Sequence, residues 1–92
     1  MAIGAYFANE SFDKKKYEET LKRLEAAGQG APKGRKYHSC FGEGDHLMVF
    51  DVWDSQADLD KFGETLMPIL AELGVTVRPP DIMPMVNEIY GK

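Results

Sequence analysis

The sequence predicts an α+β fold with the ferredoxin-like order β-α-β-β-α-β, a four-stranded antiparallel sheet with both helices on one face. Two stretches with apolar residues at helical spacing alternate with four extended stretches, which gives this order. Right-handed crossovers place the first and third strands at the centre of the sheet. Pro84 lies in the last extended stretch, and proline cannot donate to a strand ladder, so that strand is expected at an edge.

The first strand is expected at residues 2–8, where the side chains alternate between two faces. Asp13 is the expected N-cap of the first helix, with Phe12 and Tyr17 as a hydrophobic staple across it. Gly28 is the expected stop of that helix. The buried stripe of the helix is expected to consist of Tyr17, Leu21, Leu24 and Ala27.

The second and third strands are expected at residues 36–42 and 46–53. The Glu-Gly-Asp sequence at residues 43–45 is typical of a hairpin connection, so these two strands should pair with each other.

The second helix is expected to begin after Ser55 as its cap and to end at Gly74. Pro68 lies inside its apolar pattern and should kink or restart the helix, because proline removes a hydrogen bond and crowds the preceding turn. Residues 75–80 read as an extended connection and residues 81–90 as the fourth strand. The apolar stripe of the helix contains Leu59, Phe62, Leu66, Ile69, Leu70 and Leu73.

Composition and charge exclude several classes of protein. The chain of 92 residues fits one domain, residues 1–92, with 43% hydrophobic and 28% charged residues. A net charge of −4 argues against nucleic acid as a partner. No apolar run reaches the roughly 18 residues of a membrane span. Cys40 is the only cysteine and the first residues lack the pattern of a signal peptide, so a cytoplasmic location is expected.

The sheet face opposite the helices is expected to pair with a second copy of the chain. The third strand carries apolar side chains on both of its faces, whereas a face exposed to water should be polar. Leaving several such side chains in water forgoes roughly 1.5–3 kcal/mol each. A symmetric homodimer through the open sheet face would cover them.

Residues 49–55 (VFDVWDS), followed by Leu59 and Phe62, resemble the acidic-x-Trp-acidic-Ser pattern of the dimeric α+β barrel superfamily, in particular small proteins similar to antibiotic-biosynthesis monooxygenases. That family includes cofactor-free oxygenases of aromatic polyketides, haem-degrading enzymes and proteins with no known activity. The resemblance implies a dimer that binds a small, largely apolar or aromatic metabolite between sheet and helices. The resemblance further implies that the protein is either a cofactor-independent oxygenase, with no cofactor expected, or a non-enzymatic ligand-binding or interaction module.

His38 and Asp51 are the candidate catalytic residues. Histidine titrates near neutrality, so His38 on the second strand is suited to take or give a proton, or it pairs locally as an edge-strand residue. Asp51 on the central strand is costly to bury without a partner. It would serve as a base or, as a structural alternative, pair with Arg35, Lys36 or the dimer mate.

Tyr6, Trp53 and Asn87 are the candidate substrate-binding residues. The Trp53 ring suits a ligand wall or an apolar anchor in the core or interface. Tyr6 offers a hydroxyl that packs with its tip in water if it binds no ligand, and Asn87 offers an amide that would orient a carbonyl or pair at a strand end. The position of four polar groups distinguishes an enzyme from a binding module: Tyr6, Asn87, His38 and Asp51 should lie together in one solvent-reachable cavity. If they scatter across both sheet faces, the enzyme that uses them is excluded.

Other kinds of site have little support in the sequence. Cys40 is expected to be a small buried hydrophobe, because a nucleophilic thiol requires a base or a positive charge beside it. The spacing of His38, Cys40 and His46 matches no metal-ligand motif, so no metal site is expected. No glycine-rich phosphate loop follows a strand.

Overall fold

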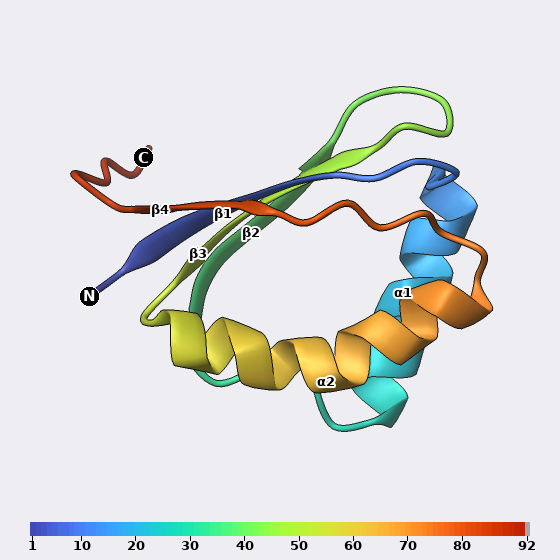
Figure 1. Cartoon of the computed structure of the whole chain (residues 1–92), viewed down its shortest axis with the longest axis horizontal. Coiled ribbons are helices and arrows are strands. Elements are labelled where there is room, and N and C mark those ends of the chain that lie inside the picture. Colours follow the sequence, from blue (N-terminus) through green and yellow to red (C-terminus); the bar gives the residue numbers. More distant parts are fainter. Residues whose placement is uncertain (92) are drawn as a thin grey trace.

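A computed structural model describes residues 1–91 and confirms the predicted order of elements. The four strands form one antiparallel sheet in the order β2-β3-β1-β4, with β3 and β1 central as predicted. Both helices lie on the same face of this sheet (Figure 1). The elements are β1 (Ile3–Ala8), α1 (Lys14–Ala26), β2 (Arg35–Phe41), β3 (Met48–Trp53), α2 (Gln56–Glu72) and β4 (Asp81–Pro84).

Both helices begin at the predicted capping residues. The Asp13 side chain accepts a hydrogen bond from the Lys16 amide, and the Ser55 hydroxyl accepts one from the Asp58 amide. The rings of Phe12 and Tyr17 meet edge to face, with centroids 6.0 Å apart, as the predicted staple requires. These contacts fix the start of α1 beside the sheet.

Two expectations about the C-terminal half are met only in part. Of the two outcomes expected at Pro68, a kink or a restart, the restart does not occur, because α2 is continuous from Gln56 to Glu72. The fourth strand ends at Pro84 rather than at residue 90. One further bond, from the Met85 amide to the Ala2 carbonyl, follows before the chain leaves the ladder.

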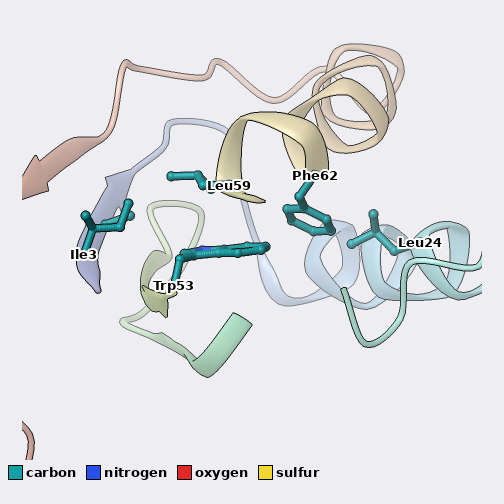
Figure 2. Close-up of a cluster of buried hydrophobic side chains, with 6 residues drawn as sticks. Ile3, Leu24, Trp53, Leu59 and Phe62 are labelled. Carbon is teal, nitrogen blue, oxygen red and sulfur yellow. The ribbon is translucent and has the colours of Figure 1, made fainter. Parts of the chain in front are cut away.

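Trp53 is the centre of the core between sheet and helices. Its side chain is fully buried at the end of β3, with its ring centroid 5.2 Å from that of Phe62 on α2. Leu59 of α2 and Leu24 of α1 lie in the same cluster (Figure 2). The exit from β3 therefore joins the sheet to both helices.

The open face of the sheet is partly covered by the C-terminal segment. A Cβ on Gly4 would lie 3.0 Å from the Met85 sulfur, which places Met85 over β1. Farther along, Glu88 forms an ion pair with Lys36 on the opposite edge strand, β2, with the nitrogen and oxygen 3.2 Å apart. Segment 85–88 thus crosses the sheet face that neither predicted helix covers.

Candidate functional site

A small cavity lies between the sheet and both helices. It measures about 60 Å³, which is room for a few water molecules. Its wall is mostly apolar and includes Phe7, Leu24, Val49, Phe62, Leu66 and Leu70. The polar residues in the wall are Asn9, Thr20, Arg35, His38 and Asp51. A few polar groups in an apolar wall are typical of a small-molecule site.

His38 and Asp51 form a short hydrogen bond across β2 and β3. The two residues are paired in the strand register, which places both side chains on the helix-covered face. His38 Nδ1 lies 2.6 Å from Asp51 Oδ1. A carboxylate only accepts, so Nδ1 carries the proton. The imidazole is thereby fixed in orientation in the way that an acid-base histidine requires.

Tyr17 of α1 completes a chain of three groups. Its hydroxyl lies 2.7 Å from His38 Nε2, and the two rings are nearly parallel, at 10°. With the Nδ1 proton directed to Asp51, a neutral imidazole accepts the Tyr17 proton at Nε2. Burial raises the pKa of the Tyr17 phenol, with further contributions from Cys40 and Asp51, so the hydroxyl keeps its proton at neutral pH.

Asp51 is 3% exposed and has two donors. Trp53 Nε1 donates to its second oxygen, Oδ2, at 3.2 Å, in addition to the bond from His38. The predicted pairing of Asp51 therefore exists, but with His38 and Trp53 instead of Arg35 or Lys36. Each carboxylate oxygen has a second lone pair, so Asp51 can still accept a proton or hydrogen bond from a ligand in the cavity.

Asn9 lies in the wall of the same cavity and carries an acceptor without a hydrogen-bond partner. The residue is 6% exposed, and its Oδ1 is the only buried side-chain nitrogen or oxygen without a hydrogen-bond partner in residues 1–91. An unpaired buried amide oxygen costs about 1–3 kcal/mol. A ligand with an O–H or N–H group would satisfy it.

Arg35 and Thr20, which also line the cavity, have partners within the protein. The Arg35 guanidinium lies over the Phe62 ring, 5.7 Å from its centroid, and one of its nitrogens bonds to the Gly30 carbonyl. The Thr20 hydroxyl donates to the Lys16 carbonyl at 2.7 Å. Among the polar residues of the cavity wall, Asn9 is thus the one with a buried side-chain oxygen that accepts no hydrogen bond.

A larger groove of about 730 Å³ lies against the cavity, between α2 and the segment that leads into β4. Groove and cavity share Phe7, Leu66, Met67 and Val77 in their walls. Met67 is among the exposed hydrophobic residues although it also lines the cavity. A thin apolar wall therefore separates the two spaces.

The residues predicted from the sequence divide between the two sides of the sheet. His38, Asp51 and Trp53 lie together on the helix face. Tyr6 pairs with Asp81 and Phe50 on the open face, where its hydroxyl donates to the Met48 sulfur at 2.9 Å. Asn87 lies beyond β4 and is exposed. A single copy of the protein therefore brings together only His38 and Asp51, so the enzyme site that was expected to use all four groups does not form.

Two residues of the site, Tyr17 and Asn9, were not among those predicted. Tyr17 was assigned to the buried stripe of the helix, where its ring does lie. Asn9 follows β1 with the same parity as Ile3, Ala5 and Phe7, so extending the strand alternation by one step would have placed it on the helix face. The hydroxyl contact with His38 needs three-dimensional packing of helix on sheet and has no sequence signal.

Cys40 is half-buried near this chain of groups, on the side facing the helices. Burial raises the pKa of its thiol, which disfavours the thiolate, in agreement with its expected role as a packing residue. Within residues 1–91 no cluster of three or more His, Cys, Asp or Glu side chains has the geometry to hold a metal ion. None of the helices in that range is long and apolar enough to span a membrane.

Comparison with known proteins finds the same fold in solved structures. No protein-family model matches the chain, and no curated protein matches it in sequence. Solved structures do match. SnoaB, a cofactor-independent oxygenase from Streptomyces nogalater, superimposes with a TM-score of 0.66 at 14% identity over 96% of both chains.

Two further structures have the same architecture. Rv0793 from Mycobacterium tuberculosis has a TM-score of 0.61 at 18% identity, over 96% of this chain and 99% of its own. A protein from Bacteroides thetaiotaomicron, provisionally named an antibiotic biosynthesis monooxygenase, has a TM-score of 0.56 at 13% identity, over 98% of this chain and 96% of its own. The resemblance predicted from the exit of the third strand is thus confirmed at the level of the fold.

Proposed function

We propose that this protein binds a small, largely apolar molecule that carries an O–H or N–H group, and that the Asp51–His38 pair removes a proton from it. One observation carries the proposal: Asn9, whose buried Oδ1 has no hydrogen-bond partner, lies in the wall of the same apolar cavity as a hydrogen-bonded histidine–aspartate pair. The ligand's O–H or N–H would first donate to Asn9 and would then turn to Asp51, which takes the proton, so the two acceptors use the same hydrogen in succession. A site built to accept a hydrogen bond discriminates strongly against analogues that lack the donor.

The size of the cavity indicates how such a ligand would lie. About 60 Å³ accommodates a hydroxyl and little more, whereas typical ligand pockets measure roughly 300–1,000 Å³. The neighbouring groove of about 730 Å³ is large enough for a ring system. We therefore place the rings in the groove and the donor group in the cavity, reached by displacement of Leu66 and Met67. The Pro68 ring leaves the Glu64 carbonyl without its helical partner, which eases that displacement.

Deprotonation suits the chemistry of oxygenases without a cofactor. Removing a proton from a hydroxyarene gives an electron-rich anion, and the substrate itself then supplies electrons to dioxygen as the oxidant. SnoaB, which shares this fold, is a cofactor-independent oxygenase. We propose a reaction of this class on an aromatic metabolite, with Asp51 as the proton acceptor and with His38 and the Trp53 indole holding its carboxylate in place.

Binding is tested with a matched pair of probes, 2-naphthol and 2-methoxynaphthalene, which share their rings and differ in the donor. Fluorescence titration should show that 2-naphthol binds at least tenfold more tightly to the wild type, since an unmatched buried hydrogen-bonding group costs about 1–3 kcal/mol. Asn9→Leu should abolish that preference. It should also leave the protein equally or more stable, because it removes an unpaired buried oxygen. Equal affinity of the wild type for both probes contradicts the proposal.

Turnover is tested by oxygen uptake with electron-rich hydroxyarenes as substrates. Asp51→Asn should lower the rate by about 10²–10⁴, the usual contribution of acid-base catalysis, while 2-naphthol still binds. Binding with no oxygen uptake by the wild type across such substrates would instead favour a non-enzymatic ligand-binding module.

We also propose that two copies associate through the open sheet face. Exposed apolar side chains gather on this face and on the C-terminal segment, and a monomer would leave them in water. The most exposed are Val86 at 99% and Ile89 at 88%. Tyr37, Phe41, Met83 and Tyr90 are also exposed there.

A further inference from the structure

We infer that Tyr17 is the residue through which protons pass between solvent and the Asp51–His38 pair. The His38 side chain is 21% exposed, but both of its ring nitrogens have hydrogen-bond partners within the protein. The inference rests on the proposed function in that the pair must exchange protons with solvent between turnovers, and it adds the route for that exchange.

The first argument is the burial of Asp51. The carboxyl group is nearly inaccessible to water, and the fully buried Trp53 covers one of its oxygens. Its other oxygen faces His38 Nδ1. Inside the protein, the remaining partner of the imidazole is the Tyr17 hydroxyl. The hydrogen-bonded path from Asp51 therefore leads through His38 to Tyr17.

The second argument is the position of Tyr17 between two separate spaces. His38 and Asp51 line the inner cavity, whereas Tyr17 lines a different groove of about 410 Å³ on the outside. That outer groove is bordered by the loop between β2 and β3, including Gly42 and Gly44. The three hydrogen-bonded groups thus span from the cavity to an open groove that the ligand does not use.

The proton balance works in both directions. A solvent proton binds Tyr17 Oη while the hydroxyl proton moves to His38 Nε2 and the Nδ1 proton moves to Asp51. One proton has entered. The bonds to hydrogen in the solvent donor, in the Tyr17 hydroxyl and at His38 Nδ1 have broken, three new ones have formed, and no group is oxidised or reduced. Asp51 is then a neutral acid and His38 carries its proton on Nε2. The reverse sequence returns the same proton to solvent and restores the tautomer of His38 that carries its proton on Nδ1.

The surroundings of Tyr17 suit this role. Phe12 meets its ring edge to face and His38 stacks on it, which holds the hydroxyl at Nε2. Because burial keeps the phenol protonated at neutral pH, Tyr17 has a proton to pass on. Tyr17 contacts His38 and not the ligand, so it is a positioning and relay residue and not a catalytic one.

The test measures how fast the His38 imidazole exchanges its proton with solvent, without any ligand. ¹⁵N relaxation dispersion of the imidazole nitrogens at the titration midpoint, in dilute buffer, gives this rate. Tyr17→Phe keeps the ring over His38 but removes the hydroxyl, so the rate should fall at least tenfold. Added 4-methylimidazole, a small proton carrier, should partly restore it. Tyr6→Phe, a matched change on the opposite sheet face, should leave the rate unchanged.

A purely structural role of Tyr17 predicts the opposite change in the proton-exchange rate of His38. Losing a contact that only braces His38 would loosen the site and speed up exchange, so a rate equal to or above that of the wild type overturns the inference. If Tyr17→Phe does not fold, the rate is measured for the wild type in mixtures of H₂O and D₂O. A curved dependence on deuterium content supports protons moving in concert, and a linear one contradicts the relay. Because no ligand is present, this result stands apart from the naphthol titration.

Discussion

Asp51 has both a structural and a chemical role in this account. Its carboxylate accepts from His38 Nδ1 and Trp53 Nε1, so it orients an imidazole and satisfies an indole that is fully buried. The same two bonds hold its oxygens at the wall of the cavity. Stability and reactivity at this residue are therefore linked.

Replacing Asp51 by alanine should destabilise the protein by about 2–5 kcal/mol, because two buried donors lose their acceptor. Urea unfolding monitored by circular dichroism would measure this. Asp54→Ala, three residues along the chain at an exposed position, is the control and should change the free energy of unfolding by less than about 0.5 kcal/mol. A cost as small for Asp51 as for Asp54 would show that the buried bonds contribute little.

Cys40 and Tyr17 should make the protein less stable in alkali. Burial raises the pKa of both groups above their ordinary values of 9.0 and 10.0. The unfolded chain therefore releases these protons first, so the stabilisation is complete below about pH 9 and is lost as the pH rises through the raised values. Between pH 8 and pH 10.5, Cys40→Ala should lose less stability than the wild type in urea titrations. An identical loss would contradict burial of the thiol.

Some contacts of individual residues can be predicted from the sequence, and others cannot. His38 and Asp51 share strand parity across a hairpin, so their chemistry was visible in the sequence, and so was the burial of Trp53. Tyr6 was misleading because a lone tyrosine on a strand does not reveal which face the helices cover. The Tyr17–His38 bond depends on how α1 packs on the sheet, which residue spacing does not determine.

At the scale of elements, the connection between β2 and the helices depends on Gly34. Its φ of 88° lies in the left-handed region, and an added Cβ would overlap the Asp58 side chain. Its carbonyl accepts from the Asp54 amide at 2.7 Å, which links the start of β2 to the end of β3. Local backbone conformation here positions the strand that carries His38.

Alanine at two glycines should therefore have opposite effects. Gly34→Ala should destabilise the protein by more than 1 kcal/mol, because it combines backbone strain with the Asp58 overlap. Gly63→Ala in α2 meets no atom within 4 Å and should stabilise it by about 0.5–1 kcal/mol through helix propensity. Thermal unfolding of the two variants would measure both. The same sign for both would contradict the geometry described for Gly34.

The helices show which element boundaries a sequence can give. Asp13 and Ser55 act through hydrogen bonds to amides three residues away, so their effect is local and was predicted correctly. The end of β4 depends on the chain leaving the sheet to cross its open face, where Glu88 meets Lys36 on β2. That long-range pairing has no local signature.

At the scale of the whole molecule, the open sheet face is the part that a single chain leaves unfinished. Sedimentation equilibrium at micromolar concentration should give twice the chain mass. Val86→Asp combined with Ile89→Asp should shift the protein to a monomer, because charges would enter an apolar contact. Ala57→Asp, at an exposed position in the first turn of α2, is the matched control and should stay dimeric. A monomeric wild type would contradict the proposed association.

The central claim is that a ligand's donor group enters the cavity between sheet and helices, and a crystal structure with 2-naphthol tests it most directly. The account predicts the rings in the groove beside α2 and the hydroxyl oxygen within hydrogen-bond distance, about 3 Å, of both Asn9 Oδ1 and the Asp51 carboxylate. Leu66 and Met67 should have moved to admit it. Density for the ligand on the open sheet face, or in the groove with its hydroxyl directed to solvent, would contradict the claim.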